Sequence, residues 1–254
     1  MDIILYNIGA VIIVLLISYL LGSIPNSIWI GKVFFHKDVR DFGSGNAGGT
    51  NAGRVFGKKV GVIVIALDAL KLIIPLYVFW LIFTKAPIYN GQPLVSSVEE
   101  IYLEHTNSGI IKWPVYWLTV LGVSFGHCFP IFANFRGGKN VSSFLGIVAA
   151  ASWLFFIISA ACFFITLKIK KFVSLASIIA SSLIVTMFWI WAILLLTRAV
   201  DGSAAWFINY GPSLDCNYVA AICVTIGAAL LIIKHVPNIQ RIKEGNERKI
   251  TWMK

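Results

Sequence analysis

Long runs of apolar residues alternate with short polar segments along most of the 254-residue chain. An α-helix rises about 1.5 Å per residue, so about 20 apolar residues cross the roughly 30 Å hydrocarbon core of a bilayer. Five runs approach that length and predict spanning helices at residues 3–24, 60–84, 113–133, 172–197 and 218–233. The pattern therefore predicts an all-α, polytopic integral membrane protein.

The segment 141–167 is also mostly apolar, but it ends at a lysine cluster in residues 168–171. A single crossing would place this cluster outside, whereas Lys and Arg near helix ends tend to face the cytoplasm. Two short helices, 141–151 and 153–167, would return the chain to the side on which it entered. This interpretation gives about seven helices, with the N-terminus out and the C-terminus in.

The composition supports a membrane protein and excludes other classes. Apolar residues make up 58% of the chain and charged residues 13%, against ~45–50% and ~25% in soluble domains. The net charge of +10 favours loops that face an anionic leaflet and anionic substrates, rather than nucleic acid. The cysteines lack the spacing of metal ligands or of a disulfide framework and are interpreted as core thiols: Cys128, Cys162, Cys216 and Cys223.

Three polar regions, about 36–59, 126–140 and 234–249, fall on the expected cytoplasmic side of a single membrane domain, 1–254. The first contains a glycine-rich loop whose backbone N–H groups can turn toward an anion. Its glycine spacing matches G-x-G-x-x-G, but the loop lies between membrane helices, without the βαβ unit that dinucleotide binding requires. Its candidate ligands are Gly43, Ser44, Gly45, Asn46, Thr50, Asn51 and Arg54.

The second region places Arg136, Gly137, Gly138 and Lys139 at the start of the first short helix. Two cations, glycines and the positive end of a helix suit a phosphate. Cations beside a membrane helix are also commonly topology anchors, and His127 alone is more often a packing residue than a ligand. Both interpretations remain open from the residues alone.

The third region contains His235 and Asn238, which share a helical face if Pro237 lies in a first turn. Lys243, Arg248 and Lys249 are interpreted as electrostatic anchors to the membrane surface.

Asp68 and Lys71 lie one helical turn apart inside the second span. Charges at that depth are costly and are usually paired. We interpret this pair as a support for the polar loops rather than as part of the chemistry.

The chemistry is restricted by the scarcity of carboxylates. Asp38, Asp41, Glu244 and Glu247 are the exposed candidates, and they form no cluster suited to metal-dependent phosphoryl transfer. No G-x-S-x-G motif and no credible Cys-His pair supplies a nucleophile for an acyl-enzyme. We therefore expect no metal and no cofactor, and a direct transfer between two bound substrates, at least one of them phosphorylated.

The ordered motifs resemble the bacterial acyl-phosphate-dependent glycerol-3-phosphate acyltransferases across nearly the whole chain. They are Gly22-Ser23-Ile24-Pro25, the loop from Gly43 to Arg54, Asp68-x-x-Lys71, Gly126-His127-x-Phe129-Pro130, Phe135 to Lys139, Val173 to Ser177, and His235-x-x-Asn238-Ile239. The resemblance implies a seven-helix enzyme of the cell inner (plasma) membrane, with its active site on the cytoplasmic face. It implies acyl transfer from acyl phosphate to the 1-hydroxyl of glycerol 3-phosphate, giving lysophosphatidic acid and phosphate.

The resemblance also implies roles for individual residues. Glycerol 3-phosphate would be bound by Ser44, Arg54, Lys139, His235 and Asn238, with Ser44, His235 and Asn238 acting in catalysis. The acyl-phosphate site would comprise Gly43, Gly45, Asn46, Thr50, Asn51, Arg136, Gly137 and Gly138. His127, Asp68 and Lys71 would support both. The bilayer is the remaining partner, and no obligate protein partner is expected.

The chain departs from the family pattern at five positions. The family usually has Arg-Glu at Val236-Pro237 and Gly, Thr and Gly at Asn140, Asn246 and Leu72, respectively.

Two other functions are compatible with parts of the sequence. His36 and Asp41 have the His-x-x-x-x-Asp spacing of thioester-using acyltransferases, but they precede the glycine-rich loop with its candidate ligands, and such a pair easily arises by chance. A transporter for a phosphorylated metabolite would also explain broken helices and buried charges. Against it, the polar residues cluster at one face and no inverted repeat is visible.

Overall fold

The computed structural model describes residues 3–88, 114–197, 199 and 217–250, and its secondary structure in these ranges is entirely helical. The longer helices are α1 (Ile3–Gly22), α4 (Lys58–Lys85), α6 (Leu118–Cys128), α7 (Val141–Ala151), α8 (Trp153–Lys170), α9 (Val173–Leu196) and α11 (Tyr218–Lys243). Shorter elements are α2 (Asn26–Phe35), α3 (Gly49–Phe56) and the 3₁₀ turns η1 (Val39–Asp41), η2 (Val115–Trp117) and η3 (Ile131–Ala133).

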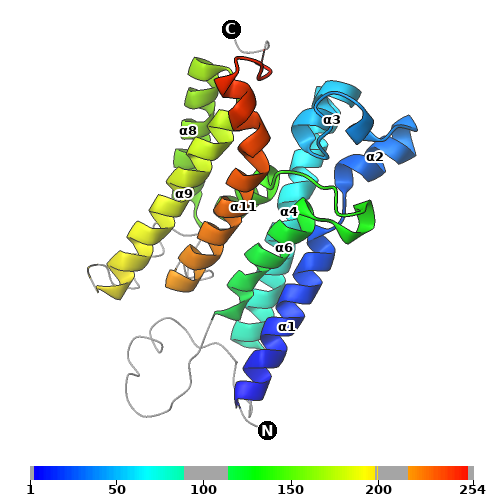
Figure 1. Cartoon of the computed structure of the whole chain (residues 1–254). Helices are drawn as coiled ribbons and strands as arrows, with labels where there is room; N and C mark the ends of the chain where they lie inside the picture. Colours follow the sequence, from blue (N-terminus) through cyan, green and yellow to red (C-terminus); the bar gives the residue numbers. More distant parts are fainter. Residues whose placement is uncertain (1–2, 89–113, 198, 200–216, 251–254) are drawn as a thin grey trace.

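The helices form two groups that run side by side (Figure 1). In one group α1 packs along α6, with α4 beside them; in the other α8, α9 and α11 pack together. Helix α11 also packs on α6, and α7 packs on α4 and α8, so these contacts join the groups. The main core lies along this junction, around the fully buried Trp117, Phe188 and Leu72.

The expected membrane architecture is confirmed in these ranges. Six helical segments of the described chain are long and apolar enough to cross a bilayer, and α7 is a shorter apolar helix of 11 residues. The predicted break lies at Ser152, whose backbone is extended and whose Oγ accepts a hydrogen bond from the Phe155 N–H, 3.2 Å away. Helix α8 is longer than expected, because it continues to Lys170 and spans 18 residues.

The chain returns to its starting side after this break, as expected. Lys139, just before α7, donates a hydrogen bond to Asn238 near the end of α11. Lys171, just after α8, accepts one from Ile250, seven residues beyond α11. Both ends of the α7–α8 pair therefore meet the same end of α11.

Two features of the polar regions were not predicted. The first region, expected to be a loop, contains α3, and α2 follows α1 after a short connection. Pro237 does not lie in a first turn, because α11 runs through it and ends at Lys243. His235 and Asn238 nevertheless share a face, since three residues separate them along one continuous helix.

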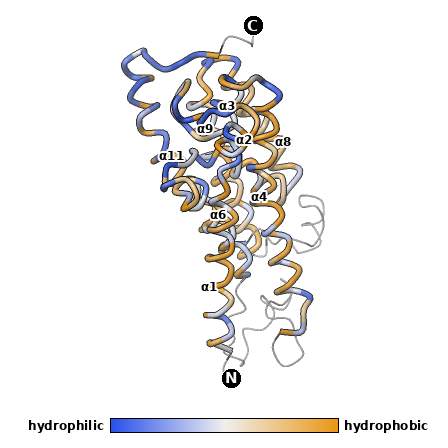
Figure 2. The backbone as a smooth tube through the Cα atoms, turned by 90° about the vertical axis from the view of Figure 1, so that its right-hand side faces the viewer, coloured by the Kyte–Doolittle hydropathy of each residue, from blue (hydrophilic) through white to orange (hydrophobic). Residues whose placement is uncertain are grey.

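Polar backbone gathers at one end of the molecule (Figure 2). The hydrophilic segments around α2, α3 and the end of α11 lie there, whereas the helices below them are mostly hydrophobic. Side chains on the outer faces of the spans are apolar and exposed, for example Ile12, Val62 and Ile165. Such faces are suited to lipid.

Close packing of α1 against α6 depends on glycines spaced four residues apart. A Cβ on Gly122 would lie 2.5 Å from the Cβ of Ser18, and one on Gly126 would collide with the carbonyl oxygen of Tyr19. Small residues at such spacing let membrane helices approach closely.

Replacing Gly126 by Ala should therefore destabilise the protein. Overpacking of this kind costs about 1–3 kcal/mol, which should appear as a lower melting temperature of the purified protein. Gly9→Ala is the matched control on α1, because a Cβ at Gly9 meets nothing within 4 Å. Equal melting temperatures for the two variants would contradict this account of the interface.

Candidate functional site

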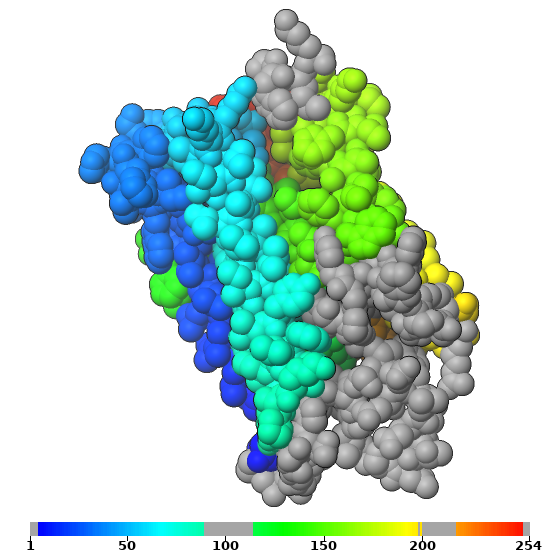
Figure 3. Space-filling model, turned by 180° about the vertical axis from the view of Figure 1, so that it is seen from behind, coloured from blue at the N-terminus to red at the C-terminus, as the bar shows by residue number. Residues whose placement is uncertain are grey.

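A cavity of about 490 Å³ opens among α3, α7, α8, α9 and α11 at the polar end. In the space-filling view from behind, the surface is hollowed between α4 and α8, and the C-terminal part of α11 is visible between them (Figure 3). One part of the wall is polar and comes from the three polar regions. The other part is apolar and includes Phe144, Leu145, Val148, Phe163 and Ile184. The cavity is therefore amphipathic.

Asn51 shapes the glycine-rich loop at the cavity wall. Its Oδ1 accepts a hydrogen bond from the Ser44 N–H, 2.8 Å away. Its Nδ2 donates to the carbonyls of Val39 and Phe42, at 2.9 and 3.0 Å. Gly43 lies in the left-handed region, with φ of 61°, beside this buried amide. Both amide hydrogens of Asn51 are used in the loop, so Asn51 holds Ser44 in place.

Three helices begin at the cavity. Its wall includes first-turn residues of α3 (Gly49, Thr50), α7 (Val141, Ser142) and α9 (Val173, Ser174). First-turn N–H groups lack intrahelical partners and carry the positive end of the helix dipole. The cavity wall thus favours anions independently of its charged side chains.

Cationic side chains dominate the same wall: Arg54, Lys139, Arg241 and Arg248. Burial and the nearby Arg241 lower the pKa of Lys139 to about 8. Burial and Arg248 also lower the pKa of Arg54. These groups are close enough to repel one another, so an anion would stabilise them all.

One carboxylate balances this cluster from the segment after α11. The Glu247 side chain is 8% exposed, which corrects the expectation of an exposed acid. Its Oε1 accepts hydrogen bonds from Asn238 (2.7 Å) and Ser174 (2.8 Å), and its Oε2 accepts one from Arg241 (2.9 Å). Burial raises the pKa of Glu247, but these hydrogen bonds outweigh it and hold the pKa below its usual value.

His235 and Asn238 face the cavity from α11. Asn238 Oδ1 accepts a hydrogen bond from Lys139 Nζ at 2.5 Å, which links Lys139 to Glu247 through one amide. His235 Nδ1 lies 2.8 Å from the carbonyl oxygen of Leu231. A carbonyl only accepts, so Nδ1 carries a proton, and Nε2 can accept a hydrogen bond when the ring is neutral.

Asp68 and Lys71 form a buried network next to the cavity. Lys71 Nζ lies 3.2 Å from Asp68 Oδ1 and donates to the Ile24 carbonyl at 3.1 Å. Asn26 Nδ2 donates to the same Asp68 oxygen at 2.9 Å. His127 Nδ1 lies 3.9 Å from it, and His127 also reaches the cavity wall. These contacts tie α4 to the start of α2 and to α6.

The structure brings most of the predicted site residues to the cavity. Those in its wall are Gly43, Ser44, Asn46, Thr50, Asn51, Arg54, His127, Lys139, His235 and Asn238. Gly45, Arg136, Gly137 and Gly138 do not line it. Arg136 is exposed, because left-handed backbone at Asn134 and Phe135 turns the chain before it. Gly137 and Gly138 instead pack against His127, where a Cβ at either position would collide.

Several residues of the wall were missed or assigned elsewhere. Arg248, interpreted as a membrane anchor, lines the cavity, as do Glu247, Arg241 and Asn246. Gly245, with φ of 75°, ends α11 in a turn that brings the next residues back toward it. A glycine shortly after a basic helix end signals such a turn. The small polar residues Ser159, Ser177 and Ser181 also line the wall and are bonded to carbonyls of their own helices.

Asn140 explains one departure of the chain from the family pattern. Its φ is 66°, a conformation that suits Gly and that Asn tolerates better than most residues. The buried amide donates to Ser124 Oγ at 2.8 Å. The side chain therefore connects the start of α7 to α6.

A family model for glycerol-3-phosphate acyltransferase matches residues 12–245. The chain belongs to the glycerol-3-phosphate acyltransferase family. It is 37% identical over 244 residues to the enzyme of Enterococcus faecalis, with 95% of this chain and 93% of that one covered. It is 34% identical over 245 residues to the enzyme of Listeria monocytogenes serotype 4a, with 95% and 98% covered.

Solved structures agree with this assignment. The crystal structure of PlsY (YgiH), an integral membrane glycerol 3-phosphate acyltransferase, in its glycerol 3-phosphate form matches with a TM-score of 0.68 and 27% identity. The match covers 96% of each chain. The lysophosphatidic acid form of the same protein matches with a TM-score of 0.67. The protein is therefore an integral membrane enzyme of glycerol 3-phosphate acylation.

The low pKa of Lys139 predicts a pH dependence of phosphate binding. Lys139 is charged below pH ~8 and neutral above it, so the affinity for glycerol 3-phosphate should fall by up to about tenfold between pH 8 and 9. We expect the KM for glycerol 3-phosphate to rise over this range. Lys139→Arg should remove the rise, because a guanidinium stays charged.

Lys85→Arg is the control for this measurement. Lys85 ends α4 and does not line the cavity, so this variant should retain the wild-type pH dependence. A pH-independent KM in the wild type, or an unchanged rise in Lys139→Arg, would contradict the assignment to Lys139.

Proposed function

We propose that this enzyme transfers the acyl group of an acyl phosphate to the 1-hydroxyl of glycerol 3-phosphate, producing lysophosphatidic acid and inorganic phosphate. The observation that carries the proposal is the amphipathic cavity, in which four cations and three helix starts adjoin an apolar wall. An acyl phosphate has the same two-part chemistry, an anionic head and a hydrocarbon chain. The second substrate adds another phosphate, which suits the excess of positive charge.

In this proposal the residues take the roles that the family resemblance implies, and their positions in the cavity wall support it. Arg54 and Lys139 bind the phosphate of glycerol 3-phosphate, with Ser44, His235 and Asn238 orienting its hydroxyls. The glycine-rich loop, with Gly43, Asn46 and Thr50, and the first turn of α3 bind the acyl phosphate. The apolar wall of α7, α8 and α9 accepts the chain.

The reaction needs positioning more than a strong protein base. The attacking hydroxyl oxygen forms a bond to the acyl carbonyl carbon, the bond from that carbon to the phosphate oxygen breaks, and phosphate leaves. Backbone N–H groups at the helix starts stabilise the carbonyl oxygen as it becomes negative. The attacking hydroxyl donates a hydrogen bond to His235 Nε2, which takes the proton and passes it to the departing phosphate.

The polar end faces the cytoplasm in this proposal, with the enzyme in the plasma membrane. Lysines and arginines concentrate at that end, for example Lys58 and Lys59 at the start of α4 and Lys168 and Lys170 at the end of α8. The positive-inside tendency then gives an outer N-terminus and an inner C-terminus. A transporter is disfavoured, because in the described part of the chain the charged residues of the cavity wall gather at the polar end and much of the remaining wall is apolar.

The donor and the absence of metal chemistry can be tested together. Purified enzyme given labelled glycerol 3-phosphate should form lysophosphatidic acid with acyl phosphate, and at most slowly with acyl-CoA. Every oxygen of Glu247 already accepts hydrogen bonds, so a chelator should leave turnover nearly intact. Loss of activity in chelator with rescue by magnesium, or equal use of acyl-CoA, would reject this mechanism.

Arg54→Lys should impair binding of the acceptor. A guanidinium offers phosphate two donors in a plane, whereas lysine offers a point charge. Loss of one charge-assisted hydrogen bond costs about 1.5–3 kcal/mol. The kcat/KM for glycerol 3-phosphate should therefore fall by about one to two orders of magnitude, while the KM for acyl phosphate changes little.

His36→Asn serves as the control for this variant. His36 is exposed and outside the cavity, and its left-handed backbone (φ 53°) tolerates Asn. This variant should retain wild-type efficiency. If Arg54→Lys does the same, or if its loss appears only in the acyl-phosphate KM, the acceptor is bound elsewhere.

A further inference from the structure

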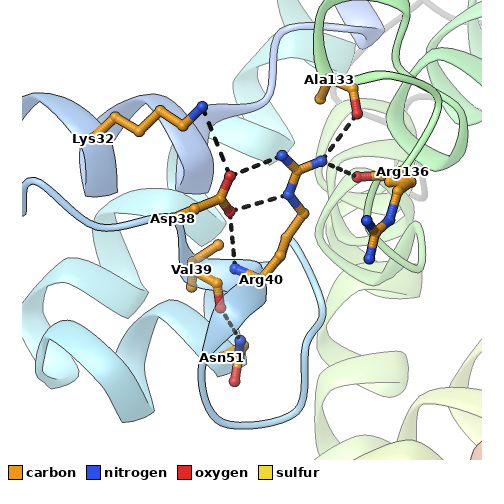
Figure 4. Close-up of polar contacts among 7 residues, drawn as sticks. All are labelled: Lys32, Asp38, Val39, Arg40, Asn51, Ala133 and Arg136. Carbon is orange, nitrogen blue, oxygen red and sulfur yellow. Dashed lines mark hydrogen bonds and ion pairs between the residues drawn. The ribbon is translucent and has the colours of Figure 1, made fainter.

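Arg40 joins two loops of the active site from outside the cavity (Figure 4). Its Nε and Nη2 donate to Asp38 Oδ1 and Oδ2, at 3.0 and 2.8 Å. Its Nη1 donates to the backbone carbonyls of Ala133 and Arg136, at 3.0 and 3.4 Å. The Asp38 and Arg40 side chains are only 14% and 15% exposed, respectively. Neither residue lines the cavity, so neither has direct access to substrate.

The geometry of this contact is fixed at both ends. Asp38 Oδ1 also accepts the Arg40 backbone N–H at 3.0 Å, which caps η1. The hydrogen bond from Arg40 holds the pKa of Asp38 below its usual value, so the carboxylate stays charged. A bidentate Arg–carboxylate pair fixes the plane of the guanidinium. That plane aims Nη1 at the second loop.

On one side, the pair is continuous with the glycine-rich loop. Val39, between the two residues of the pair, and Phe42 both accept hydrogen bonds from Asn51, which also holds the Ser44 N–H. Turn η1, Ser44 and the start of α3 therefore form one hydrogen-bonded unit. Arg54 lies on the last turn of the same α3.

On the other side, the two carbonyls belong to the loop that leads to Lys139. The Gly138 N–H, next to Lys139, donates to the His127 carbonyl at 3.0 Å. This second unit carries Lys139, whose pKa is lowered partly by the charge of Arg54. The two units therefore bring like charges together before any phosphate binds. An attachment between them must resist that repulsion.

We propose that the Arg40–Asp38 pair is a positioning pair that sets the spacing of these two loops, so that Arg54 and Lys139 can hold one phosphate. The proposal rests on the phosphate-binding roles given above. A positioning pair of this kind affects catalysis without touching substrate, because displacement of a reacting group by about 1 Å can cost about 100-fold in rate.

Arg40→Lys, Asp38→Asn and the double variant test the pair. Each single variant should lower kcat/KM for glycerol 3-phosphate at least tenfold. Both changes break the same Arg40–Asp38 contact. The kcat/KM of the double variant should therefore be no more than twofold lower than that of the less active single variant. The melting temperature without ligand should stay within about 3 °C of wild type, while its rise on addition of inorganic phosphate should shrink.

Lys32→Gln is the matched control at the same carboxylate. Lys32 Nζ lies 3.8 Å from Asp38 Oδ2, but its side chain is 58% exposed, and exposed ion pairs contribute little. This variant should behave as wild type.

Three results would overturn the proposal. The first is efficiency of Arg40→Lys within twofold of wild type. The second is multiplication of the two single losses in the double variant. The third is a loss of activity that equals the fall in the folded fraction. The phosphate-induced melting shift requires no acyl donor. An error in the proposed donor would therefore appear in the donor assay and leave this comparison intact.

Discussion

Repulsion among the cations at the polar end of the cavity is the constraint on which the rest of the site depends. Arg54, Lys139, Arg241 and Arg248 share the wall with a single described acid, Glu247. Burial lowers the pKa values of Lys139 and Arg54, and repulsion from the neighbouring cations lowers them further. A bound phosphate offsets this repulsion. The excess of positive charge that the fold must hold together therefore also supplies affinity for the substrates.

The fold gathers this excess of positive charge at the polar end of the molecule. Deep in the spans, charge is paired, as in Asp68 and Lys71. At the polar end, the cations lie at helix termini, and the starts of α3, α7 and α9 add their own positive ends. Breaking the chain at Ser152 makes this possible, because the α7–α8 pair returns to the polar end and begins α9 there. The apolar faces of these helices then form the wall below.

The sequence predicted the spans, the break and ten residues of the cavity wall, since length, charge and glycine content act locally. It failed where backbone turns decide which of several neighbouring charges faces inward. Arg136 and Lys139 are three residues apart, yet left-handed backbone at Asn134 and Phe135 turns Arg136 to the outside. Likewise, the turn at Gly245 brings Glu247 and Arg248 to the wall. The pattern of charges along the sequence does not predict which of these side chains faces the cavity.

The replacement of the family's Arg-Glu by Val236-Pro237 can be understood from the same helix. His235 and Asn238 are buried and line the cavity, whereas Val236 is 54% exposed and Pro237 is also exposed. Side chains at these two positions point away from the wall, so the substitution removes no carboxylate from the cavity. Pro237 withdraws one backbone N–H from α11, but the helix continues through it and delivers Asn238 to Lys139 and Glu247. The acid that organises this site therefore comes from beyond the end of the helix.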